Sequence, residues 1–280
     1  MMTEPAINND HTAHFVETFH GTSLPKMITT AKKIMKTPKP HITLLYVTLF
    51  AIAMGYLESA VVVYIRELYY PDGFTFPMRL ISSRVMITEL WREAATLVML
   101  LGVGIIAGKT APQRFAYFIY SFAVWDIFYY VFLRVVLGWP QSLLTWDVLF
   151  FIPTVWVGPV IAPVINSVTM ILLGLVIIFR GDMPWHVRTR WIVWSLLIVG
   201  SLIILISYTL EYSQFTLQRY SWQDLLVNGI SKQMLMSGTE YMPKKFPWWI
   251  FMAGELMHLG AVGMIWRKSK DKRGRDSSKS

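Results

Sequence analysis

The sequence contains no cysteine among its 280 residues. This absence excludes disulfide bonds, thiolate nucleophiles, iron–sulfur clusters and zinc sites with cysteine ligands. It leaves the redox compartment of the protein undecided. Any metal site must therefore use carboxylate, imidazole, hydroxyl or carbonyl ligands.

Charged residues are also scarce. They make up 15% of the chain, whereas 54% is apolar, and a typical soluble domain has about 25% charged residues. This composition excludes a soluble globular enzyme, a disordered chain and a collagen-like fibre. The net charge of +9 does not indicate nucleic-acid binding, because the basic residues lie between apolar runs and at the chain ends. We expect an all-α, polytopic membrane helix bundle whose partner is the lipid bilayer.

Six apolar runs are each long enough to cross a membrane, which takes about 20 residues. They divide the chain into a polar, basic N-terminal tail (residues 1–40), a transmembrane domain (residues 41–266) and a basic C-terminal tail (residues 267–280). The predicted spans are residues 42–65, 85–107, 115–137, 160–179, 191–210 and 248–266.

The distribution of Lys and Arg predicts the orientation. If both termini are cytoplasmic, 17 of the 26 basic residues lie in inner segments, 7 lie in outer segments, and the rest lie within spans. This excess follows the positive-inside rule. The N-terminal tail has no signal-peptide core, so we expect the first span to act as an uncleaved signal anchor. We expect both basic tails to meet anionic lipid head groups.

The segment from Asp147 to Val157 is apolar but spans only 11 residues, which is about 16 Å of helix. Pro153, Pro159 and Pro163 interrupt this segment and the start of the fourth span. We predict a short, proline-broken half-helix before the fourth span. The alternative is one long helix kinked at its prolines.

Several ionisable residues lie within the predicted spans, where each costs about 2.5–3.5 kcal/mol to insert. Counted from the outer ends, Glu58, Glu93 and Glu255 lie about 10 Å deep, and Asp126 and His258 lie about one turn deeper. The carboxylates within the spans outnumber the arginines by three. Because an uncompensated charge of that size is untenable in the membrane, bound protons or cations must balance it.

A metal site is the first hypothesis for these residues. Glu255 and His258 form a Glu-x-x-His motif on one helix, and carboxylate dimetal bundles combine such motifs with Glu from neighbouring helices. Only one motif is present, so a mononuclear or asymmetric site is equally consistent. Oxygen and nitrogen ligands suit Fe, Mn or Zn. Haem is not expected, since only His258 lies within a span. The predicted ligands are Glu58, Glu93, Asp126, Glu255 and His258, surrounded by Glu89, Arg92, Tyr130, Arg134 and Asp147.

Three other interpretations stay open. The buried acids are also typical of a proton- or cation-coupled transporter, although the inner half of the predicted bundle is almost free of charge. A membrane enzyme without metal could use Glu89 and Glu93 for acid–base chemistry on a lipid or an outer-face substrate. A purely structural protein could use the charges to hold its helices together. The pairs expected in that case are Arg92 with Glu89, and Arg134 with Asp126 or Glu58.

Two outer loops are candidates for covering the site. Residues 66–84 could cap it. Residues 211–246 show apolar periodicity from Trp222 to Ile230, which indicates an amphipathic helix lying on the membrane surface. That helix would be either a lid or a plain connector.

Two stretches carry a resemblance. They are residues 57–71, LESAVVVYIRELYYP, and residues 124–147, which begin VWDIFYY and end GWPQSLLTWD. They resemble uncharacterised multi-pass bacterial membrane proteins over the region from the first to the fourth span. That family has no assigned activity, so the resemblance implies a bacterial inner-membrane location and no function.

Overall fold

The computed structural model describes residues 39–180, 187–219 and 238–277. The chain divides into residues 1–42 and a body formed by residues 43–280, and the body contains nearly all of the described residues. The predicted amphipathic helix between Trp222 and Ile230 lies outside the described residues, as does most of the N-terminal tail.

Six helices in the described ranges are long and apolar enough to cross a membrane, which confirms the predicted polytopic helix bundle. Most of the helices extend beyond the predicted apolar runs, most clearly at the C-terminal ends of α10 and α7. Their bounds are α3 (Pro40–Tyr69), α4 (Ser83–Ala107), α5 (Ala111–Leu137), α6 (Ile161–Arg180), α7 (Val187–Leu217) and α10 (Trp248–Ser277).

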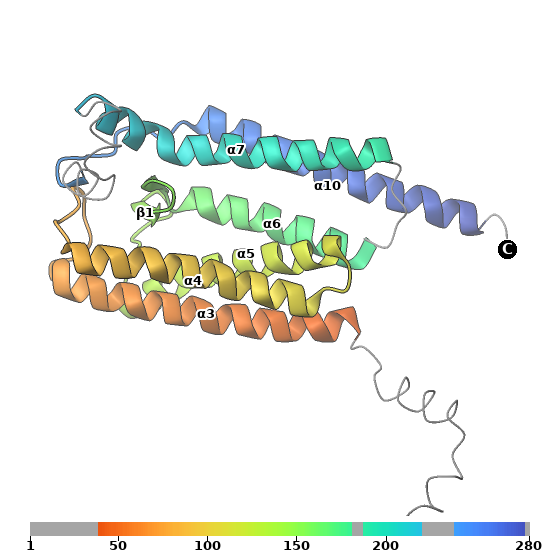
Figure 1. The fold of residues 1–280 in the computed structure, drawn as a ribbon, viewed down its shortest axis with the longest axis horizontal. Helices are drawn as coiled ribbons and strands as arrows, with labels where there is room; N and C mark the ends of the chain where they lie inside the picture. The colour runs from red at the N-terminus through yellow and green to blue at the C-terminus, as the bar shows by residue number, and fades with distance from the viewer. Residues whose placement is uncertain (1–38, 181–186, 220–237, 278–280) are drawn as a thin grey trace, which may run out of the picture. The chain divides into compact units, whose positions relative to one another are not determined.

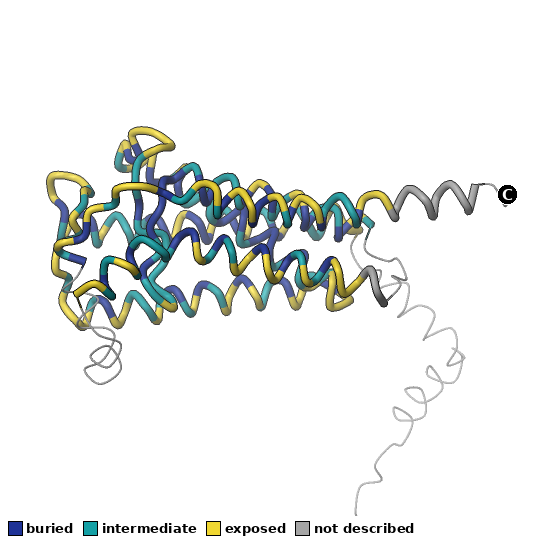
Figure 2. Tube along the Cα trace, turned by 90° about the horizontal axis from the view of Figure 1, so that it is seen from above, coloured by how far each residue is buried: buried dark blue, intermediate teal, exposed yellow. Residues whose placement is uncertain are grey.

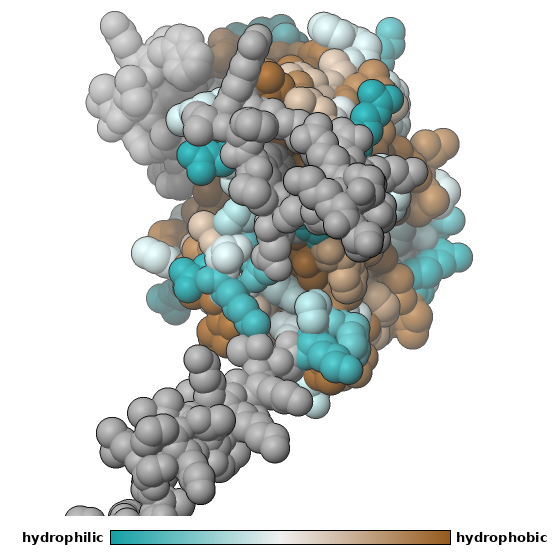
Figure 3. Space-filling model, turned by 90° about the vertical axis from the view of Figure 1, so that its right-hand side faces the viewer, coloured by the Kyte–Doolittle hydropathy of each residue, from teal (hydrophilic) through white to brown (hydrophobic). Residues whose placement is uncertain are grey.

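The helices lie side by side with α5 and α6 near the middle (Figure 1). α5 packs against α4 and α6, and α10 packs against α6 and α7. Large apolar side chains such as Leu49, Val98, Ile106, Leu202 and Leu256 are exposed on the flanks, and exposed residues recur along the helices (Figure 2). Hydrophobic residues also dominate the flanks in the view from the end where α3 begins (Figure 3). Such exposed apolar flanks fit contact with lipid.

Close approach of α4 to α5 depends on small residues. A side chain at Gly104 would lie 2.7 Å from the backbone oxygen of Arg114, and one at Gly108 would lie 2.3 Å from the backbone nitrogen of Arg114. The two glycines thus form a Gly-x-x-x-Gly contact between neighbouring helices. Nearby, Thr110 caps the start of α5, where its hydroxyl accepts a hydrogen bond from the backbone N–H of Gln113 at 3.4 Å.

The segment predicted as a half-helix is a β-hairpin, so both the half-helix and the kinked-helix predictions are wrong. β1 (Trp146–Phe150) pairs antiparallel with β2 (Trp156–Pro159), with Val148 opposite Val157. Aromatic and β-branched residues dominate both strands, and these residue types favour a pleated, half-buried surface. β2 packs on α6 and α7, where the rings of Trp156 and Tyr208 stack at 5.8 Å between centroids.

The hairpin marks one end of the bundle, called here the hairpin end, and polar groups gather near it. The other half is filled by an apolar cluster from several helices. That cluster includes Val47, Ala51, Leu100, Ala116, Tyr117, Leu173, Ile177, Leu197, Ala261 and Ile265.

Candidate functional site

A cavity of about 110 Å³ lies at the hairpin end of the body, between α3, α4, α5, β1 and the loop that joins α3 to α4. Most of the residues predicted for the site line it. Its polar lining is Glu58, Arg66, Tyr70, Glu89, Arg92, Glu93, Asp126, Tyr129, Tyr130 and Asp147, and its apolar lining includes Phe74, Met78, Ile81, Val85, Met86 and Phe150.

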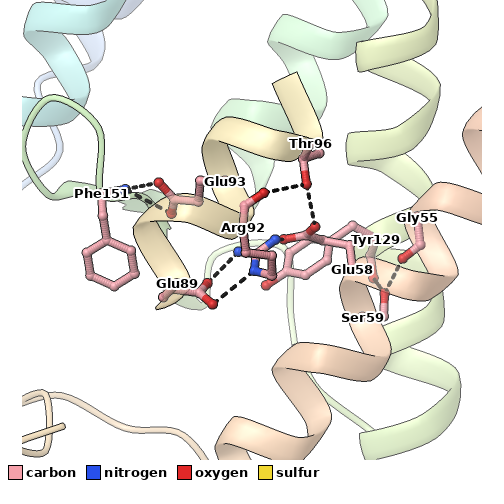
Figure 4. A network of polar contacts seen from close by, with 9 residues as sticks. All are labelled: Gly55, Glu58, Ser59, Glu89, Arg92, Glu93, Thr96, Tyr129 and Phe151. Atoms are coloured by element: carbon pink, nitrogen blue, oxygen red, sulfur yellow. Dashed lines mark hydrogen bonds and ion pairs between the residues drawn. The ribbon is translucent and has the colours of Figure 1, made fainter. Parts of the chain in front are cut away.

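Arg92 holds two carboxylates together on one side of the cavity (Figure 4). Its Nη1 donates to Glu58 Oε1 on α3, while its Nε and Nη2 both donate to Glu89, one turn earlier on α4. The i, i+3 spacing of Glu89 and Arg92 places them on neighbouring positions of one helix face. Thr96 Oγ1 lies 3.4 Å from Glu58 Oε2 as a further donor. The predicted pair of Arg92 with Glu89 is therefore present, and Glu58 joins it.

Glu93 is anchored differently. Its side chain is nearly fully buried, and both carboxylate oxygens lie 3.1 Å from the backbone N–H of Phe151, which donates to them from the turn of the hairpin (Figure 4). Within the described part of the chain Glu93 makes no ion pair. Glu93 therefore ties the hairpin to α4 and, unlike Glu58 and Glu89, has no ion-pair partner among the described residues.

Asp147 forms a second ion pair at the cavity. Arg66 Nη2 lies 3.3 Å from Asp147 Oδ1, and the hydroxyl of Tyr130 donates to Asp147 Oδ2 at 3.3 Å. Burial raises the pKa of Asp147 to about 6, although the charge of Arg66 acts in the opposite direction. The guanidinium of Arg66 stacks on the ring of Trp139, with 3.7 Å from Cζ to the ring centroid.

Asp126 is half-buried in the lining and accepts a hydrogen bond of 2.8 Å from the hydroxyl of Ser167 on α6. With Asp126 included, five carboxylates and two guanidinium groups line the cavity. If all are ionised, the lining carries three more negative than positive charges.

Glu255 and His258 lie elsewhere, so the predicted group of five metal ligands is split. His258 Nε2 lies 3.2 Å from the backbone oxygen of Leu197 and 3.2 Å from Ser201 Oγ, both on α7. Glu255 is 1% exposed, and Thr169 of α6 lies beside it. Neither of its carboxylate oxygens makes a hydrogen bond of ordinary geometry with a described residue. Neither residue lines the cavity.

No three His, Asp or Glu side chains in the described ranges are placed to hold one metal ion. The sequence indicates only the depth of each residue in its span. Depth fixes the position of a side chain along the bundle axis but not the neighbour that it faces. The shared depth of Glu255 with Glu58 and Glu93 therefore does not bring these residues together.

Arg134 also differs from the prediction that it pairs with Asp126 or Glu58. Its Nη1 donates to the backbone oxygens of Gly138 and Pro140, the latter at 2.9 Å. Gly138 adopts a left-handed conformation with φ of 66° and ends α5. Arg134 thus satisfies carbonyl groups at a helix C-terminus, a favourable place for a cation.

Arg66 is a site residue that the sequence pattern did not indicate, because it lies just beyond the first apolar run, where a loop charge is expected. The aromatic residues that contact Arg66 could not be predicted from their spacing either, because Trp139 and Phe74 lie in different loops. The chain matches no protein-family model, and no curated protein or solved structure matches it. The function must therefore be inferred from the geometry of the cavity.

Proposed function

We propose that this protein binds an amphiphilic cation in the cavity at the hairpin end of its helix bundle. One observation carries the proposal: five carboxylates and two arginines line a pocket whose remaining wall consists of tyrosines and apolar side chains. An excess of buried negative charge favours a cationic guest over a neutral or anionic one. The apolar wall favours a guest with a hydrocarbon part.

Glu93 and Asp126 are the groups proposed to neutralise the cation. The other three carboxylates are engaged by arginine, Asp147 by Arg66 and the two acids of the α3–α4 network by Arg92. Among the described residues, Glu93 and Asp126 accept hydrogen bonds from neutral donors alone, Phe151 N–H and Ser167 Oγ. Because both line the cavity, a cation beside either one would gain a charge interaction without breaking an ion pair.

The cavity lies in one half of the bundle, and this position supports a receptor or an enzyme more than a transporter. The apolar cluster of the other half separates the cavity from the far end of the bundle, and a transport path needs polar stations through both halves. For an enzyme, Glu93 is the acid–base candidate, whereas Glu89 is held by Arg92 in a two-bond contact. A purely structural role explains the ion pairs of Arg66 and Arg92. It does not explain why two further acids, Glu93 and Asp126, line the cavity without an ion-pair partner among the described residues.

A divalent metal ion is the second candidate for the same cavity. Three predicted ligands, Glu58, Glu93 and Asp126, line it, but no three acids of the described ranges are placed to share one ion, so an Fe, Mn or Zn ion would bind through at most two carboxylates. In this interpretation Glu255 and His258 are not ligands.

The proposed location is the inner membrane of a bacterium, with both termini in the cytoplasm and the hairpin end facing outward. The distribution of basic residues supports this orientation, because they concentrate in the tails and at the opposite end. The cavity would then open in the outer half of the bilayer, and the basic tails would meet anionic lipid on the inner surface.

Ligand titration of the purified protein tests the proposal. Trp125 lines the cavity and is one of 12 tryptophans, so the part of the fluorescence change that is lost in Trp125→Phe reports on the cavity. We expect dodecylamine to bind more tightly than dodecanol or dodecanoate, and we expect Glu93→Gln and Asp126→Asn each to weaken it by about tenfold, which corresponds to the loss of one charge-assisted contact. Glu67→Gln is the matched control, because Glu67 is exposed on α3 outside the cavity.

Equal binding of dodecylamine and dodecanol, or equal weakening by Glu67→Gln and Glu93→Gln, would overturn the amphiphilic-cation proposal. Titration with Mn²⁺ and Zn²⁺, together with elemental analysis, tests the second candidate. Stoichiometric metal that is lost in both Glu93→Gln and Asp126→Asn supports it, whereas metal retained in both variants contradicts it.

A further inference from the structure

Two hydrogen-bond donors in the cavity lining have no acceptor among the described residues. They are Nη1 of Arg66 and Nε1 of Trp125. The two residues are 7% and 5% exposed, and both line the cavity that contains the acids. Buried donors are nearly always paired in folded proteins, so two unpaired donors in one pocket indicate an acceptor supplied by a ligand.

The guanidinium of Arg66 is fixed in place, which makes its free nitrogen informative. Its Nη2 contacts Asp147 Oδ1 at 3.3 Å, and its Cζ lies 3.7 Å from the ring centroid of Trp139 and 4.8 Å from that of Phe74. Stacking and the ion pair together restrict rotation of the group. Nη1 therefore cannot readily turn toward another partner, and it offers a charged donor to the cavity.

Arg66 and Glu93 belong to different parts of the same pocket, because Glu93 follows Arg92, the ion-pair partner of Glu58, directly in α4. Arg66 lies two helical turns after Glu58 on α3, which is about 12 Å along the helix. Tyr129 lines the same cavity, and the charges of both ion-pair groups, Arg66 with Asp147 and Arg92 with Glu58, reach it. The cavity thus has one region that favours a cation and another that favours an anionic oxygen.

We infer that the ligand is a zwitterion, with an ammonium group facing Glu93 and an anionic oxygen group accepting from Arg66 Nη1. This inference rests on the proposed function and names its ligand class. The same chemistry is available from a zwitterionic phospholipid head group and from a free small zwitterion. In both cases Trp125 Nε1 supplies a second, neutral donor to the guest.

The test compares three probes on the purified protein: dihexanoyl phosphatidylethanolamine, free O-phosphoethanolamine and dodecylamine. We expect at least one of the two zwitterions to bind about tenfold more tightly than dodecylamine, because it adds a charge-assisted hydrogen bond. Tight binding of the lipid alone identifies a head group as the source. Tight binding of both zwitterions would show that a free zwitterion binds without acyl chains.

The variants Arg66→Gln and Arg66→Gln/Asp147→Asn test the residue. We expect both to lower the affinity for the zwitterions relative to that for dodecylamine, because only the zwitterions carry the anionic oxygen that Arg66 Nη1 would bind. The double variant removes the buried pair as a unit, so it avoids leaving one charge unpaired. Arg84→Gln is the matched control, because Arg84 is exposed at the start of α4 and outside the lining.

Failure of this inference differs from failure of the proposed function. If dodecylamine binds and depends on Glu93 but neither zwitterion binds more tightly, the zwitterion inference is wrong and the cation proposal stands. If none of the probes binds, both are wrong. Equal effects of Arg84→Gln and Arg66→Gln on zwitterion affinity would also overturn the role of Arg66.

Discussion

Arg92 on α4 donates a hydrogen bond to Glu58 on α3, and this ion pair joins two helices whose other neighbour is α5. The same guanidinium also binds Glu89, so one cation serves two carboxylates. A buried ion pair contributes little net stability, but the loss of one partner leaves an uncompensated charge. Arg92 is therefore the residue on which the α3–α4 side of the cavity depends most.

Replacing Arg92 with methionine should destabilise the protein strongly. The change leaves Glu58 and Glu89 buried beside each other without a cation, and we expect a loss of about 3–5 kcal/mol in the free energy of unfolding. Unfolding of the detergent-solubilised protein in a denaturing-detergent titration measures it. Arg79→Met is the control, because Arg79 and Asp72 form an exposed pair at 3.8 Å, and we expect its effect to stay below about 1 kcal/mol. Equal losses in the two variants would contradict the central role of Arg92.

Alanine at Gly104 should destabilise the packing of α4 on α5. Its Cβ would lie 2.7 Å from the backbone oxygen of Arg114, which has little freedom to move. We expect a loss of about 1–3 kcal/mol from overpacking. A Cβ at Gly102 on the same helix would have no atom of a neighbouring element within 4 Å, so Gly102→Ala should be neutral or stabilising. The same unfolding titration compares the two alanine variants, and a neutral Gly104→Ala would show that the helices can separate at no cost.

The sequence was sufficient to predict the membrane fold but not the hairpin. Apolar runs of about 20 residues have few alternatives to a spanning helix. The run from Trp146 to Val157 is too short for that argument, and a short apolar run does not distinguish a strand from a helix. The segment forms strands because Val148 pairs with Val157 across the turn, and hydropathy alone does not reveal which residues pair.

The candidate site was predicted in part for a related reason. Glu58, Glu93 and Asp126 line one cavity, as their predicted depths, which differ by about one helical turn, suggested. His258 has a similar depth, but its ring faces α7, where it contacts Leu197 and Ser201. Rotation of a helix about its axis depends on packing with its neighbours, which hydropathy alone does not describe.

Asp147 should make stability depend on pH in weakly acidic solution. Burial raises its pKa from 3.8 to about 6 in the folded protein, so the folded state binds a proton that the unfolded state releases between these values. The free energy of unfolding should therefore fall as the pH rises from 4 to 6, by at most about 3 kcal/mol at about 1.4 kcal/mol per pH unit.

Comparison with Asp147→Asn isolates this contribution, because other carboxyl groups titrate in the same range. We expect the difference in unfolding free energy between wild type and variant to change between pH 4 and 6 and to become constant above about pH 7. Thermal unfolding at intervals across this range measures the difference. A difference that does not change with pH would mean that Asp147 titrates alike in the folded and unfolded protein.

The bond from Phe151 N–H to Glu93 should control the opening of the hairpin. Both carboxylate oxygens of Glu93 lie 3.1 Å from that nitrogen, so the turn of the hairpin is attached to α4. In Glu93→Leu the N–H loses its acceptor, and we expect faster hydrogen exchange at Phe151, by about tenfold for the loss of about 1.4 kcal/mol. Glu93→Gln keeps a carbonyl oxygen as acceptor, so its exchange should stay near that of the wild type.

This pair of variants separates two roles of one residue, because both remove the charge proposed to bind the cation and only leucine removes the acceptor. Faster exchange in the glutamine variant equal to that in the leucine variant would show that the turn is held by the charge of Glu93 rather than by its hydrogen bond.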